Sequence, residues 1–121
     1  MTSTIRSPLT VTEVSGLTVG VFPPEVDVSN AHVIRDEALR LLDDGATALI
    51  LDLTTTRFCD CAGVTAILRV GRRAASLHTP VCLVLPATGP VHRIAAMTGL
   101  TKRFPVSGSV AAARGVLTRP V

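Results

Sequence analysis

The chain has 121 residues and a formal net charge of +3, with 47% apolar residues, 17% charged residues and only three aromatic side chains, all Phe. This composition excludes a disordered polymer, and the small charge with so few stacking residues argues against a nucleic-acid-binding protein. No apolar run approaches the roughly 18 residues of a membrane span, and the N-terminus has no secretory apolar segment. We therefore expect one soluble, cytoplasmic domain over residues 1–121, with its core at about residues 9–117.

Two short strands open the predicted fold. Apolar and polar residues alternate at residues 9–14 and again at 17–22, and Ser15-Gly16 between them is a turn signal. Pro23-Pro24 ends this segment, because proline cannot donate to a strand ladder. The pattern predicts a β-hairpin.

The first helix is expected to follow Asp27 or Ser29, either of which can serve as its N-cap. Gly45 ends it as a left-handed C-terminal residue. The inward face is defined by apolar residues at helical spacing: Ala31, Ile34, Ala38, Leu41 and Leu42.

A central strand is predicted at residues 48–53, because this run is apolar on both sides of the pleat until Asp52. A second helix begins near Val64, and residues 81–85 form a further buried strand between two prolines. The expected inward stripe of the second helix is Val64, Ile67, Leu68, Gly71 and Ala75.

The last third of the chain predicts a third helix, a short edge strand at residues 104–106, and a final helix capped by Ser109. Thr88 and Pro90 suit the start of the third helix, and Gly99 ends it. The alternating order predicts an α/β fold with a mixed, mostly parallel sheet of four to five strands, about four flanking helices and an opening hairpin.

The sequence offers little sign of catalysis. Cys59, Cys61 and Cys82 are an odd number of cysteines, and the C-x-C pair lacks a second pair for zinc. No histidine forms a nucleophile–base pattern, and no glycine-rich phosphate loop is present. We expect no enzyme, no metal site and no cofactor, and we interpret the basic cluster Arg69, Arg72 and Arg73 as a solvated helix face.

The loop before the second helix is the candidate site. Cys61 stands at or just before the helix start, where free N–H groups and the helix dipole favour a reactive thiolate. The charge of Asp60 opposes ionisation, and a small buried thiol is the alternative. Asp27 and Asp60 both sit at loop-to-helix junctions, where they either cap helices or share a partner-binding rim.

Four stretches carry a resemblance to a known family. They are residues 24–27 (PEVD), residues 58–63 (FCDCAG), residues 91–100 (VHRIAAMTGL) and residues 104–106 (FPV). Together they make the chain resemble the STAS family, in its bacterial anti-sigma factor antagonist branch, over about residues 9–117.

This resemblance implies a protein-binding module that regulates transcription through partner switching. Its partner is expected to be an anti-sigma factor that is also a serine kinase, and the family's phosphoacceptor serine corresponds to Cys61. Neither Cys61 nor the following Ala62 carries a hydroxyl, so the serine phospho-switch is expected to be lost. The implied partner-binding rim is Asp27, Asp60, Cys61, Ala62, Gly63 and Thr65.

Three functions stay open at this point. The favoured one is an antagonist-like module that binds its regulator without phosphorylation. The second is a redox-gated regulator that uses Cys61 or Cys59. The third is a scaffold domain of a larger signalling complex, and a homodimer is compatible with each. We expect no nucleic-acid or membrane partner.

Overall fold

The opening hairpin forms in the computed structural model, which describes residues 8–118. Strands β1 (Thr10–Val14) and β2 (Leu17–Val21) pair antiparallel. Both turn residues, Ser15 and Gly16, have positive φ angles of 52° and 82°. Two consecutive residues with positive φ give the backbone twist that a two-residue hairpin loop needs, so the predicted Ser15-Gly16 turn forms.

The other strands of the main sheet add in parallel. β4 (Leu49–Asp52), β6 (Val81–Val84) and β7 (Val106–Ser107) extend the sheet in the order β1-β2-β4-β6-β7. Each neighbouring pair from β2 onward is parallel. Every residue of β4 and β6 is buried, as expected for central strands covered on both faces.

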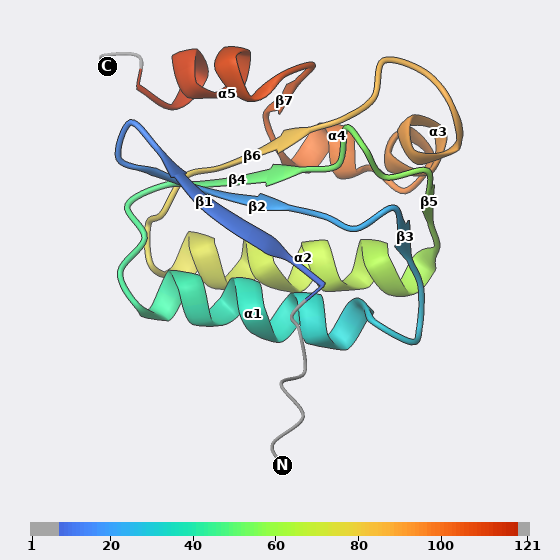
Figure 1. Ribbon diagram of the computed structural model, residues 1–121, viewed down its shortest axis with the longest axis horizontal. Helices are drawn as coiled ribbons and strands as arrows, with labels where there is room; N and C mark the ends of the chain where they lie inside the picture. Colours follow the sequence, from blue (N-terminus) through green and yellow to red (C-terminus); the bar gives the residue numbers. More distant parts are fainter. Residues whose placement is uncertain (1–7, 119–121) are drawn as a thin grey trace.

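Helices cover both faces of this sheet (Figure 1). α1 (Ala31–Asp43) and α2 (Cys61–Ser76) lie side by side on one face, and α5 (Val110–Leu117) lies on the other. α3 (Pro90–Met97) and the short α4 (Leu100–Arg103) complete the set. The larger core cluster lies on the α1–α2 side, and a smaller one packs against Ala113 of α5. The predicted α/β class with its mixed sheet is confirmed, and α4 is a fifth helix that the sequence pattern did not indicate.

A second, two-stranded sheet was also not predicted. β3 (Glu25–Val26) and β5 (Phe58–Cys59) pair in parallel, with Glu25 opposite Phe58 and Val26 opposite Cys59. These strands run at the end of the molecule where α3 lies (Figure 1). Two residues are too few to show a period of two, so no periodicity could reveal them.

The helix ends differ in part from expectation. Asn30, and not Asp27 or Ser29, occupies the N-cap position of α1, and its side chain caps no helical N–H group. Gly89, and not Thr88, precedes α3. Gly45 follows α1 with a φ of +99°, as predicted. Its N–H donates to Leu42, and the next N–H donates to Leu41, which is a Schellman arrangement.

The inward stripe of α2 is shifted from the predicted one. Val64 and Ile67 are buried as expected, but Ala75 is exposed and Leu68 and Gly71 are only half-buried. The positions that complete the buried face are Gly63, Ala66, Val70 and Ala74. Gly71 lies under the ring of Phe104, whose atoms occupy the space that a Cβ at Gly71 would need. The ring of Phe104 therefore packs on α2 at a position where a larger residue would have to displace it.

Candidate functional site

The β3–β5 pair brings two loops together. Val26 lies opposite Cys59, so the next residues along the parallel strands, Asp27 and Asp60, are neighbours in register. The Asp60 N–H donates to the carbonyl of Val26 at 3.1 Å, which continues the ladder by one bond. The two acidic loop residues that the sequence placed on one rim therefore sit at the same end of the molecule.

Asp60 is the N-cap of α2. Its Oδ1 accepts the backbone N–H groups of Ala62 at 2.9 Å and Gly63 at 3.3 Å. These N–H groups have no partner within the helix, so the carboxylate satisfies two of the four donors left at the helix start. The Asp60 carboxylate thus holds the loop in shape.

Gly63 lies where α2 touches the small sheet. A Cβ at this position would stand 2.5 Å from the Sγ of Cys59 and 2.8 Å from Cγ1 of Val26. Such distances are inside van der Waals contact, so only glycine fits without displacing its neighbours. Gly63 is buried, and its part in the rim is to let the helix approach β3 and β5 closely.

The two cysteines of the C-x-C pair lie in different surroundings. Cys61, the first residue of α2, is exposed, whereas Cys59 is buried, and all three cysteines of the chain are free. Burial raises the pKa of the Cys59 thiol from 9.0 to about 11, and the charges of Asp60 and Cys61 add to this shift. Of the two redox candidates, only Cys61 reaches the surface.

The remaining rim residues, Asp27 and Thr65, each make local hydrogen bonds. The Asp27 carboxylate accepts hydrogen bonds from the hydroxyl and the backbone N–H of Ser29, and these bonds lower the pKa of Asp27. Thr65 is exposed one turn beyond Cys61, and its hydroxyl donates to the Cys61 carbonyl at 2.9 Å. Its Oγ1 is therefore directed at the helix backbone.

A groove between α1 and α2 adjoins this rim, and the sequence did not reveal it. Its volume is about 380 Å³. Ala62 and Thr65 belong to both the rim and the groove, and Arg69 stands at its side. Alanines and arginines at helical spacing were visible in the sequence, but only the packing of the two helices puts them around one hollow. Residues 8–118 contain no cluster of three or more potential metal ligands, and no helix among them could span a membrane.

The STAS domain profile matches residues 9–113, and the chain belongs to the STAS domain family. The resemblance seen in the sequence is thereby confirmed. No curated protein matches the chain at a significant level.

Several solved structures share the fold. An anti-sigma factor antagonist from Mycobacterium paratuberculosis is 22% identical, with a TM-score of 0.83 over 92% of this chain and 93% of its own. A STAS domain protein from Planctomyces limnophilus, also an anti-sigma-factor antagonist, is 17% identical, with a TM-score of 0.73 over 91% and 97%. Phosphorylated SpoIIAA from Bacillus is 21% identical, with a TM-score of 0.68 over 89% and 98%. At these identities the likeness establishes the fold.

Proposed function

We propose that this protein is an anti-sigma factor antagonist-like module, which binds an anti-sigma factor in the bacterial cytoplasm and regulates transcription through partner switching without catalysing a reaction. Its membership of the STAS family and the nature of its structural neighbours support this function. The observation that carries the proposal is the position of Cys61. This residue is exposed at the first position of α2, beside the Asp27 loop.

Serine phosphorylation does not switch this protein between bound and unbound states. In the family pattern a serine occupies the position of Cys61, and a phosphate there would stand next to the Asp60 carboxylate. Such a dianion would repel that charge and could not be buried in an interface without a large desolvation cost. Here neither Cys61 nor Ala62 offers a hydroxyl, so binding persists while this covalent control is lost.

An intact-mass experiment tests this proposal. The protein is incubated with a candidate anti-sigma kinase and ATP, and complex formation is followed separately by size-exclusion chromatography. We expect a complex, no phosphate on the wild type, and one phosphate on Cys61→Ser. Cys61→Ala is the matched control, because it changes the same side chain without adding a hydroxyl. A phosphorylated wild type, or the absence of any complex, would contradict the proposal.

The exposure of Cys61 also favours a second candidate, a redox-gated regulator. With hydrogen peroxide as oxidant, the Cys61 thiolate attacks one peroxide oxygen, the O–O bond breaks, and the products are a sulfenic acid and hydroxide. Loss of partner binding after peroxide treatment, absent in Cys61→Ser, supports gating. Cys59, being buried, is not the residue expected to react. If no kinase-like regulator binds in either redox state, the scaffold function remains, and sedimentation of the protein alone tests for a homodimer.

A further inference from the structure

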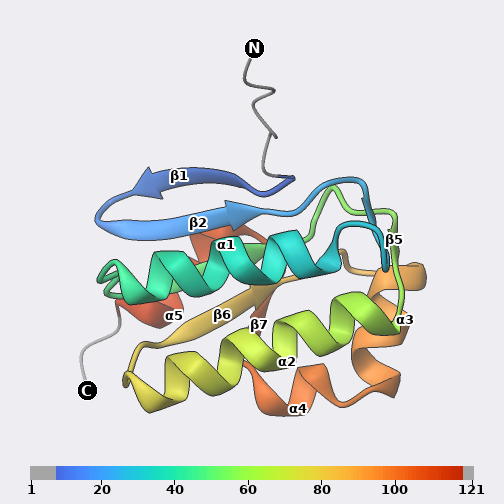
Figure 2. The ribbon, with the colours of Figure 1, turned by 90° about the horizontal axis from the view of Figure 1, so that it is seen from below.

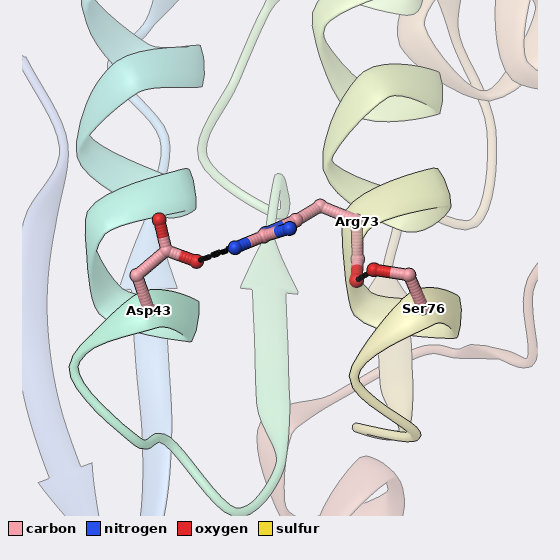
Figure 3. Close-up of polar contacts among 3 residues, drawn as sticks. All are labelled: Asp43, Arg73 and Ser76. Atoms are coloured by element: carbon pink, nitrogen blue, oxygen red, sulfur yellow. Dashed lines mark hydrogen bonds and ion pairs between the residues drawn. The ribbon is translucent and has the colours of Figure 1, made fainter.

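The hollow between α1 and α2 lies along the N-terminal halves of the two helices, and an ion pair joins the helices near their C-terminal ends. The helices run along the same face of the sheet (Figure 2). Near their C-terminal ends Arg73 of α2 reaches across to Asp43 of α1, with Nε at 2.9 Å and Nη2 at 2.8 Å from Oδ1 (Figure 3). No other ion pair joins the two helices among residues 8–118. This ion pair lies outside the residues that line the hollow, and Ala62 and Thr65 of the Cys61 rim line it near the N-terminal end of α2.

The floor of the hollow is made of small apolar side chains. Ala31 and Ala66 are buried, Ala62 is half-buried, and all three line the hollow. Val28 also lines the hollow, and 78% of its surface is exposed, which is high for a branched apolar side chain. Small floor residues leave room for the larger apolar side chains of a ligand, in the manner of a groove that takes one face of a helix.

The sides of the groove are basic. Arg69 of α2 makes no ion pair or side-chain hydrogen bond with any other residue in the described part of the chain. Arg35 of α1 pairs only with the adjacent Asp36, 3.0 Å away on its own helix. No carboxylate is among the residues that line the hollow. A ligand with negative charges beside an apolar face would therefore match both the sides and the floor.

We infer that this groove binds an acidic, amphipathic helical segment of the protein partner. This inference rests on the proposed function only in taking the partner to be a protein, and it adds the chemistry of the segment that the partner presents. The apolar face of the segment covers Ala31, Ala62 and Ala66, and its carboxylates meet Arg35 and Arg69. Nucleic acid fits less well, because the floor offers no aromatic side chain on which bases could stack.

A pair of designed peptides tests the inference. Each has about 18 residues, or five helical turns, with Leu at i, i+3, i+4 and i+7 positions and either Glu or Lys on the remaining faces. Binding to the full chain is measured by fluorescence anisotropy and located by amide chemical-shift changes. We expect the Glu peptide to bind, to shift the amides of Ala31, Ala62 and Ala66, and to weaken as salt is raised. The Lys peptide should bind at least about tenfold more weakly.

Charge reversal in the protein supplies the matched comparison. Arg69→Glu should weaken the Glu peptide by about five- to tenfold, because one exposed attraction becomes a repulsion. Arg114→Glu makes the same charge change on α5, across the sheet from the groove, and should leave binding unchanged (Figure 1). Val28→Ser, which removes an exposed apolar side chain without burying a polar one, should also weaken binding.

Several results would overturn the inference: equal binding of the Glu and Lys peptides, shifts confined to another surface, or indifference to Arg69→Glu. Occupation of the groove by a second copy of this chain, seen as self-association that Arg69→Glu abolishes, would also overturn it. The proposed function fails separately. If an anti-sigma factor binds wild type and Arg69→Glu equally, the proposed function holds and the proposed role of the groove fails. If the Glu peptide binds but no anti-sigma complex forms, the role of the groove holds and the proposed function fails.

Discussion

Asp60 and Cys61 are adjacent in the chain, yet their side chains have different roles. The Asp60 carboxylate is held by two backbone N–H groups of α2, while the Cys61 thiol is exposed. A partner that approaches this rim would therefore meet Cys61 directly and Asp60 mainly through the loop that it shapes. This division predicts different consequences for substitutions at the two positions.

Replacement of the Asp60 cap should destabilise the fold modestly. Asp60→Ala leaves the Ala62 and Gly63 N–H groups without their acceptor and should lower the free energy of unfolding by about 1 kcal/mol, within a range of about 0.5–2. Asp60→Asn keeps a side-chain oxygen and should lose much less. Urea denaturation measures both values. Equal stability of Asp60→Ala and wild type would show that the cap bond contributes nothing.

The three thiols should react at different rates. Cys61 is exposed and Cys59 and Cys82 are buried, and burial raises the pKa of both buried thiols. Because the thiolate is the reacting form, iodoacetamide should modify Cys61 first in the native protein and all three only after unfolding. Peptide mass mapping over time identifies the order. Cys61→Ser should abolish the fast phase, and fast labelling of Cys59 would contradict the described burial.

At the scale of elements, the site depends on the closeness of α2 to the small β3–β5 sheet, and Gly63 tests it. Alanine normally favours a helix over glycine by up to about 1 kcal/mol. At Gly63 the new Cβ would overlap Cys59 and Val26, and overpacking of this kind costs about 1–3 kcal/mol. We expect Gly63→Ala to lower the free energy of unfolding in spite of its better helix propensity.

Gly115 in α5 provides the matched control. A Cβ there would meet no atom within 4 Å, and its φ is not positive. Gly115→Ala should therefore stabilise the protein by up to about 1 kcal/mol. Opposite signs for the two substitutions in the same denaturation assay would support the close approach of α2. Stabilisation by both would mean that the Cys59–Val26–Gly63 contact is loose.

Most elements of the fold could be predicted, because each carries a local signal. The hairpin turn, the doubly buried strand β4 and the Gly45 helix end all follow from short stretches of chain. β3 and β5 could not be predicted, since each contributes two residues and exists only through the other. The strand-to-helix connection that carries Cys61 could be predicted from its local pattern, and its role as a site stays a prediction. The groove was missed because it arises from packing between α1 and α2, and Arg69 alone resembles any solvated helix residue.

At the scale of the whole molecule, the two faces of the sheet are unequal. α1 and α2 bury the larger cluster, which includes Cys59, while α5 covers a smaller cluster that includes Cys82. Each cluster thus encloses one thiol, and both thiols resist ionisation because they are buried. Because the pKa values of both buried thiols are raised, the free energy of unfolding of the domain should depend on pH in the alkaline range.

This linkage gives a prediction with a definite sign. Between about pH 9 and 11 the Cys59 thiol ionises in the unfolded chain but stays protonated in the folded one, so the unfolded state binds fewer protons and stability falls as pH rises. Few other groups interfere, because the chain has no tyrosine and only one lysine, Lys102. The free energy of unfolding, measured by urea titration across this range, should decrease steadily.

Removal of the buried thiols isolates their share of the effect. Cys59→Ala should lower stability at every pH because it leaves a small cavity, yet its curve between pH 9 and 11 should be flatter than that of wild type. The double variant Cys59→Ala/Cys82→Ala should be flatter again, because burial also raises the pKa of Cys82. Parallel curves for all three proteins would place the alkaline loss of stability elsewhere, and a rise in wild-type stability toward pH 11 would contradict the buried, protonated state of Cys59.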